Sequence, residues 1–149
     1  MIVIAKKRRQ KDLPTELQHY AFSQDKQHNL PLTIDKKYVV AGIRETLNNK
    51  FYLIIPDDGE LKGYPWWFPS SLFKVVDKSM PPDWKKGGVE GDVLLTFPEL
   101  ALDKTGLFES NLEDGEDREV SVFLKYYETY ARSHGLWYVD GKLVEDREE

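Results

Sequence analysis

The chain has 149 residues, of which 40% are hydrophobic and 13% aromatic, and its net charge is −5. This length is typical of one domain, and the aromatic content excludes a disordered chain. Because cysteine is absent, disulfides and thiolate metal sites are excluded too. No apolar run reaches the roughly 20 residues that a membrane helix needs, so we expect no membrane partner and a cytoplasmic location.

The acidic balance of the chain favours basic partners over nucleic acids. Phosphate contacts need clustered lysine and arginine, whereas here 26 acidic side chains outnumber 21 basic ones. The exception is the basic run of residues 6–11, which carries five cations. No aromatic residue accompanies this run, so we interpret it as a charged arm and regard direct nucleic-acid binding as the weaker alternative.

The first 30 residues predict this N-terminal arm followed by a short helix. Leu13 and Leu17 stand at helical spacing within residues 12–24, and Asp12 is a residue type that often precedes a helix.

Residues 34–97 predict a β-rich core. Apolar, β-branched and aromatic residues form short runs separated by polar or proline-containing segments, which is the pattern of strands and turns. The expected strands are residues 38–43, 51–55, 72–76 and 92–97. Several short strands at this spacing indicate a small, strongly bent antiparallel sheet or a partial barrel.

The C-terminal part predicts one long amphipathic helix over residues 112–134 and a hairpin over residues 136–144. The helix shows apolar positions at intervals of three and four residues, and Gly135 fits its end. Asp140-Gly141 is a strong signal for a two-residue hairpin turn. The whole chain therefore predicts a single α+β domain.

The sequence contains no recognisable catalytic pattern. Its three histidines, His19, His28 and His134, lack the spacing of a metal site or a triad. Neither the acidic residues 57–60 nor the glycine-rich residues 87–91 match a calcium loop or a phosphate loop. We expect no enzyme, no metal and no cofactor; an enzyme with an unfamiliar site would need a deep pocket lined by convergent polar groups.

The most unusual segment is the aromatic run of residues 64–69. Prolines at both ends favour an extended backbone, so Trp66 and Phe68 point to one face and Tyr64 and Trp67 to the other. In one interpretation one of these faces enters the core, and the C-terminal helix or another segment covers the other. In the other, Tyr64 and one tryptophan form an exposed anchor for a partner, and the neighbouring loop supplies a charged rim of Asp57, Asp58 and Glu60.

Residues 109–119 contain six acids and one arginine. Acids in the first turn of a helix stabilise it, which is the simpler interpretation. A dense anionic surface can also occupy the cationic groove of a nuclease and gives fast association. The residues that would form this surface are Glu113, Asp114, Glu116 and Asp117.

One stretch of the chain resembles a known group of proteins. The pattern consists of residues 37–43, 51–54, 64–69, 72–77 and Trp84. It resembles small bacterial proteins with an SH3-like β core, some of which are similar to immunity proteins of polymorphic or contact-dependent growth inhibition toxin systems. The resemblance covers residues 34–85 and carries no catalytic residue; the helix and the hairpin lie outside it.

Two functions follow as hypotheses. The resemblance implies an immunity protein, the antitoxin partner in such a toxin system, that neutralises a cognate toxin, for example a basic nuclease domain, by stoichiometric binding. The alternative is an SH3-like adaptor module that binds peptide segments through its aromatic patch. The expected partner-binding residues are Asp57, Asp58, Glu60, Tyr64, Trp66, Trp67, Glu113, Asp114, Glu116 and Asp117.

Overall fold

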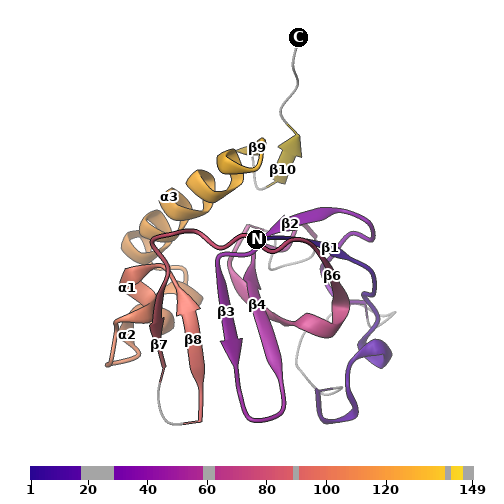
Figure 1. Ribbon diagram of the computed structural model, residues 1–149, viewed down its shortest axis with the longest axis horizontal. Coiled ribbons are helices and arrows are strands. Elements are labelled where there is room, and N and C mark those ends of the chain that lie inside the picture. The colour runs from indigo at the N-terminus through magenta and orange to yellow at the C-terminus, as the bar shows by residue number, and fades with distance from the viewer. Residues whose placement is uncertain (18–28, 59–62, 89–90, 140–141, 146–149) are drawn as a thin grey trace.

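The computed structural model describes residues 1–17, 29–58, 63–88, 91–139 and 142–145. It is an α+β fold in which antiparallel sheets are covered on one side by helices (Figure 1). Three predicted features lie outside the described residues: most of the helix expected over residues 12–24, the acid Glu60, and the hairpin turn Asp140-Gly141. Before residue 18 the chain forms two short 3₁₀ turns, η1 (Gln10–Asp12) and η2 (Thr15–Leu17).

The first sheet is built around the start of the chain. Its three strands have the order β2 (Lys37–Val39), β1 (Ile2–Ala5) and β6 (Phe73–Asp77), all antiparallel. Strand β1 is apolar throughout and lies between two neighbours, so both its edges are hydrogen-bonded and most of its side chains are buried. Residues 1–30, expected to form an N-terminal arm and a short helix, thus begin with a strand that is paired on both sides.

The second sheet has five antiparallel strands and forms the centre of the molecule. Their order is β5 (Trp66–Pro69), β4 (Lys50–Ile54), β3 (Gly42–Glu45), β8 (Val93–Thr96) and β7 (Lys85–Gly87). The chain passes from β2 in the first sheet to β3 in the second with only two residues between them. The described strands form separate sheets, and no closed barrel joins them.

The expected strands all exist, but besides β1 two strands within the β-rich core, β5 and β7, were missed. The predicted runs correspond to β2 with β3, β4, β6 and β8. Strand β5 lies within the aromatic segment and is followed by the 3₁₀ turn η3 (Ser70–Leu72), which leads into β6. Strand β7 has the sequence Lys-Lys-Gly and gives no β signal of its own, because its pairing with β8 decides its conformation.

Three helices follow the second sheet: α1 (Pro98–Ala101), α2 (Leu107–Glu113) and α3 (Asp117–Ser133). The single helix predicted over residues 112–134 is thus too long at its start. Gly115 adopts a φ of +74°, in the left-handed region, and this interrupts the helical path between α2 and α3. The described residues contain no helix that is both long and apolar enough to span a membrane.

Helix α3 covers the second sheet with the face that its sequence predicts. Phe123, Tyr127, Tyr130 and Ala131 are buried in one core cluster together with residues of β1, β2, β4, β5 and β8 and with Phe97. The rings of Phe97 and Phe123 meet edge to face at 6.0 Å between centroids. A second cluster lies between the two sheets and includes Val3, Tyr38, Tyr52 and Phe68.

The chain continues from α3 into the predicted hairpin. Strands β9 (Leu136–Val139) and β10 (Lys142–Glu145) pair antiparallel, with Trp137 opposite Val144. Leu136 is buried, and the ring of Tyr138 contacts Tyr127 of α3 at 5.3 Å between centroids. The hairpin extends beyond the sheets at one end of the molecule (Figure 1).

Candidate functional site

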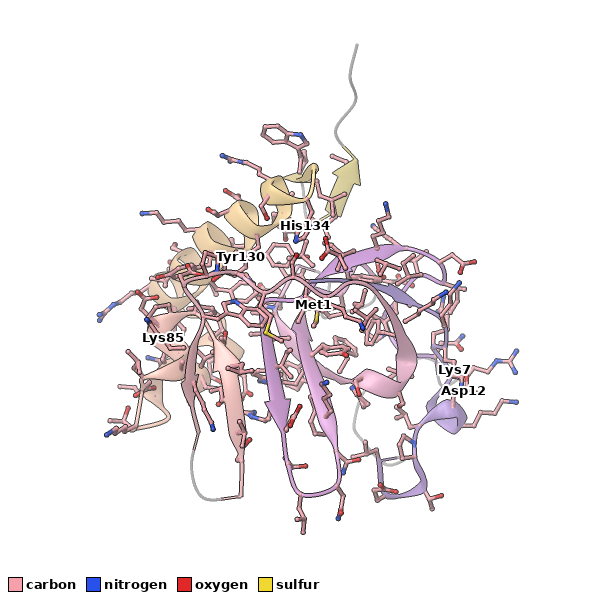
Figure 2. The ribbon with its side chains drawn as sticks, viewed as in Figure 1. Met1, Lys7, Asp12, Lys85, Tyr130 and His134 are labelled. Carbon is pink, nitrogen blue, oxygen red and sulfur yellow. The ribbon has the colours of Figure 1, made fainter. Side chains whose placement is uncertain are left out.

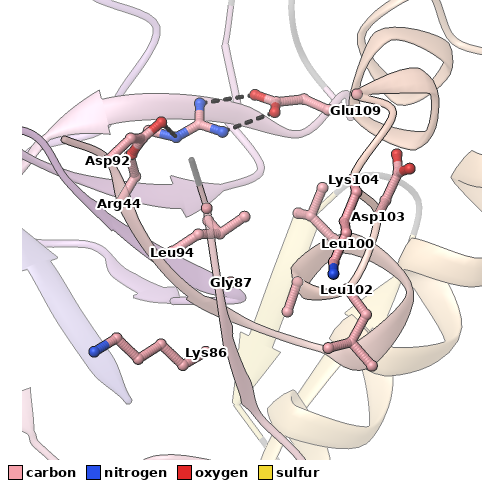
Figure 3. A pocket seen from close by; sticks show the side chains of 13 residues that line it. Arg44, Lys86, Gly87, Asp92, Leu94, Leu100, Leu102, Asp103, Lys104 and Glu109 are labelled. Carbon is pink, nitrogen blue, oxygen red and sulfur yellow. Dashed lines mark hydrogen bonds and ion pairs between the residues drawn. The ribbon is translucent and has the colours of Figure 1, made fainter. Parts of the chain in front are cut away.

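A compact charged cluster fastens α2 to the second sheet. Arg44 of β3 donates two parallel hydrogen bonds to Glu109 of α2, each 2.7 Å long, from Nη1 to Oε1 and from Nη2 to Oε2 (Figure 3). Its Nε lies 3.4 Å from Oδ2 of Asp92, and its guanidinium stands 4.5 Å above the ring of Trp67. Trp67 in turn donates from Nε1 to Oε1 of Glu109 at 3.2 Å. Bidentate geometry of this kind is the strong form of a charged hydrogen bond.

This cluster contains more negative than positive charge. Burial opposes the charge of Arg44, but hydrogen bonding to Glu109 and the charges of Glu109, Asp92 and Glu113 outweigh it, so the pKa of Arg44 is raised. At Glu113, burial and the neighbouring charge of Glu109 raise the pKa of the carboxyl group, and Arg44 only partly offsets them. One cation is shared among several acids, so the site would accept another positive charge.

The acids beyond this cluster form what we call the acidic turn, residues Glu113, Asp114, Gly115, Glu116 and Asp117, which joins α2 to α3. All four of its acidic side chains are exposed. None of them forms an ion pair with a lysine or arginine in the part of the chain that the structure describes. The acidic turn therefore presents four carboxylates, none of which is neutralised by an ion pair within the described chain.

Tyr64 lies against the acidic turn although it is about 50 residues away in sequence. Its side chain is 49% exposed. A Cβ atom placed on Gly115 would be 3.3 Å from Cε1 of Tyr64, which shows how closely the ring approaches the turn. The structure thus brings together the exposed tyrosine and the acidic residues that the sequence singled out separately.

The other aromatic residues of this segment are less exposed to solvent than Tyr64. Trp67 is only 7% exposed and belongs to the core beneath α3, as in the simpler interpretation of the sequence. Trp66 is half-buried and packs with Phe68 against the second core cluster. The prediction that Trp66 and Phe68 share one face while Trp67 points to the other is confirmed. As an exposed anchor, only Tyr64 remains of the pair Tyr64 and Trp67.

The two described acids of the predicted charged rim, Asp57 and Asp58, differ from each other in exposure and in their contacts. Asp57 is half-buried and accepts hydrogen bonds from Tyr38 at 2.6 Å and Thr33 at 2.7 Å, and Lys36 lies 3.1 Å from it. Burial opposes the ionisation of Asp57, but these hydrogen bonds and the charge of Lys36 outweigh it and lower its pKa. Asp57 therefore holds β2 and its preceding loop in place, whereas Asp58 beside it is exposed.

A pocket of about 390 Å³ adjoins the Arg44 cluster. Arg44, Asp92 and Glu109 contribute its charged wall, and Leu94, Leu100 and Leu102 contribute apolar surface (Figure 3). Gly87 permits the close packing of β7 on α1 here, because a Cβ on it would lie 1.8 Å from the carbonyl oxygen of Ala101.

The sequence did not predict the Arg44 cluster, because its pairs join residues far apart in the chain and no local pattern marks them.

Few of the other described residues are candidates for metal binding or acid–base catalysis. Among the described residues, no group of three or more histidine, aspartate or glutamate side chains is placed to hold a metal ion. Burial lowers the pKa of His134, whose Nδ1 lies 3.1 Å from Oδ2 of Asp77. His19 and His28 lie outside the described residues.

Comparison of the chain with family models, with curated proteins and with solved structures found no match.

Proposed function

We propose that this chain is a stoichiometric binding protein for a basic protein partner, acting in the cytoplasm as an immunity protein that neutralises a cognate bacterial toxin. The observation that carries the proposal is the position of exposed Tyr64 against the acidic turn. Tyrosine is among the residues that dominate interface energies, because it adds large contact area at low entropic cost. Four carboxylates beside it would attract a cationic surface and speed association.

The Arg44 cluster supports this role by making the surface rigid. The paired hydrogen bonds between Arg44 and Glu109 fix α2 to the sheet one turn before the acidic turn begins. A surface that is already ordered loses less entropy when it binds. Since burial and Glu109 raise the pKa of Glu113, a lysine or arginine from the partner would relieve this repulsion and gain binding energy there.

We also infer that the two sheets form an SH3-like partial barrel, strongly bent at residues 40–41. In support, β2 and β3 follow one another almost without interruption although they lie in different sheets, and η3 joins β5 to β6 across the same boundary. The second core cluster fills the space between the sheets. Such a barrel would place the acidic turn outside the β core, on the helices that follow it.

The proposal is tested by co-expressing the chain with the product of the adjacent gene and measuring both protection of the cells and complex formation. We expect a tight complex of one to one stoichiometry. Tyr64→Ala should weaken it by about 30-fold, the effect of losing a hot-spot residue. Asp114→Lys should slow association several-fold at low salt, whereas Glu16→Lys, an exposed acid of η2 with the same charge change, should not.

Two results would overturn the proposal. One is a neighbouring gene product that has no toxic activity and forms no complex. The other is a complex whose affinity is unchanged by Tyr64→Ala and by Asp114→Lys, because the partner would then use another surface.

The alternative, an adaptor that binds peptides through the aromatic segment, would have to rely on Tyr64 and half-buried Trp66, since Trp67 lies in the core. Binding of a proline-rich peptide that is lost in Tyr64→Ala but unaffected by Asp114→Lys would favour the adaptor over the immunity protein.

A further inference from the structure

The basic run after β1 is part of the folded structure. The backbone N–H groups of Lys6 and Lys7 both donate to the carbonyl oxygen of Leu72, at 2.8 and 3.2 Å. The carbonyl oxygen of Arg8 accepts from Leu30, and Arg9 forms a bridge with Asn29. This segment is therefore held at both of its sides, and its cations project from a fixed backbone.

Four consecutive cations, Lys6, Lys7, Arg8 and Arg9, line one open hollow of about 450 Å³, together with Asp12, Asn29 and Ile34. Among the described residues that line it, Asp12 is the single carboxylate, and its Oδ2 already accepts from the backbone N–H of Arg9 at 3.3 Å. The hollow is thus strongly cationic in a protein whose net charge is −5. We call it the basic hollow.

Most of these cations have no counter-charge within the described chain. Lys6 pairs with Asp35 at 2.6 Å. Lys7 and Arg9 are exposed and pair with no carboxylate among the residues that the structure describes. Arg8 is half-buried, and its Nε is enclosed without a described hydrogen-bond partner. Like charges held this close repel one another, so an anion placed among them would be bound favourably.

We propose that the basic hollow binds phosphate groups, supplied either by a free nucleotide or polyphosphate or by the backbone of a nucleic-acid strand. The volume exceeds that of a single phosphate, and the forked donors of Arg8 and Arg9 match phosphate oxygens. No aromatic side chain is among the described residues that line it, so no base would stack there. The basic hollow would therefore recognise the charge of the phosphate groups and not a nucleotide sequence.

The basic hollow is separate from the acidic turn. Lys7 and Asp12 lie at one side of the molecule and Lys85 of β7 at the other, on the side of the helices (Figure 2). Phosphate binding therefore stands independently of the proposed toxin binding, and either can fail while the other holds.

The test measures binding of two probes to the full chain. Pyrophosphate is titrated by calorimetry, and a fluorescent oligothymidylate of about 12 nucleotides is titrated by anisotropy, each at several salt concentrations between roughly 50 and 200 mM. We expect Lys7→Glu with Arg9→Glu to weaken binding at least about tenfold. The matched control, Lys85→Glu with Lys86→Glu, makes the same charge change on β7 and should leave binding intact.

The two probes distinguish the sources of phosphate. Pyrophosphate that binds as well as the oligonucleotide identifies a free nucleotide or polyphosphate as the ligand. Oligonucleotide binding that far exceeds pyrophosphate binding, with a log–log salt slope of about −2 for roughly three neutralised phosphates, identifies a strand. Both results support the proposal when the control retains binding.

The proposal is overturned if neither probe binds at the lower salt concentration. It is also overturned if the control variant loses binding as much as the Lys7 and Arg9 variant does, because the attraction would then be general and not located in the basic hollow. Thermal unfolding of both variants shows whether each has kept the native fold before its binding is compared.

Discussion

The Arg44 cluster and the basic hollow differ in how their charges are arranged. Around Arg44, charges of opposite sign form ion pairs, whereas residues 6–9 carry neighbouring charges of one sign. The guanidinium of Arg44 is 19% exposed; it is hydrogen-bonded to Glu109, forms an ion pair with Asp92 and stacks on the ring of Trp67. Lys7 and Arg9 are exposed and have no such neighbours among the described residues. Substitution should therefore cost folding energy in the first region and binding energy in the second.

The largest effect on stability is expected for Trp67→Ala. This side chain is 7% exposed, packs beneath α3 and hydrogen-bonds Glu109, so its removal leaves a cavity and a broken cluster. Loss of a buried tryptophan costs about 3–5 kcal/mol. Urea denaturation compares this variant with Trp137→Ala, which removes a 42% exposed tryptophan. If both variants lose an equally small free energy of unfolding, Trp67 does not belong to the core, and the adaptor hypothesis is favoured.

A smaller but still large effect is expected for Arg44→Met. The variant leaves Glu109 and Asp92 partly buried without their cation, and breaking a buried pair from one side costs about 3 kcal/mol, somewhat less here because the pair is not fully enclosed. Arg132→Met serves as the control, since Arg132 meets Glu128 at 3.8 Å on an exposed surface and should cost under about 1 kcal/mol. If both variants unfold at the same urea concentration, the Arg44 cluster does not stabilise the fold.

Gly115→Ala should destabilise the protein by about 1–2 kcal/mol. The φ of +74° at this position is costly for any residue with a Cβ, and the new methyl group would press against Tyr64. The same substitution should also weaken partner binding, because it moves the ring that we propose as the anchor. Gly91→Ala is the control: its φ is +81°, but nothing lies within 4 Å of the added Cβ, so its cost should be conformational only.

The smallest effect is a pH-dependent one at Glu113. Its pKa in the folded state is raised above the ordinary value of 4.5 by burial and by Glu109, so the folded state holds this proton more tightly than the unfolded state does. Its contribution to stability is therefore full below that value and is lost as the pH rises through the folded pKa. Glu113→Gln should stabilise the protein by a few tenths of a kcal/mol at neutral pH, with no gain at a pH well below 4.5. Thermal unfolding at both pH values checks this, and a gain of equal size at acid pH would contradict it.

Much of the fold could be predicted from local patterns. The apolar spacing of residues 120–131 predicts the buried face of α3, and the hairpin signal predicts β9 with β10. Local patterns failed to predict the elements whose structure depends on long-range pairing or on an unusual backbone conformation. Strand β7 carries two lysines and is a strand because β8 pairs with it, and the helix is interrupted at Gly115 because this residue adopts a positive φ.

The candidate site was predicted only in its parts. Tyr64 and the acidic turn each stood out in the sequence, but their contact depends on the path of the chain through four strands and two helices. The Arg44 cluster joins β3 to α2 across 65 residues and carried no signal at all. The basic run was recognised as a charge pattern, while its fixed backbone was not, since the partners Leu72 and Leu30 are distant in sequence.

The position of β1 has a consequence for how the protein is made. This strand is the middle one of its sheet, and Ile2 pairs with Asp77 on one side and with Val39 on the other. During synthesis β1 leaves the ribosome long before β6 exists, so the sheet cannot close until more than half of the chain has been translated. Pairings over such separations form slowly, and the edge of β1 that faces β6 stays unpaired until they do. Chaperone binding to β1 on the nascent chain would follow from this delay.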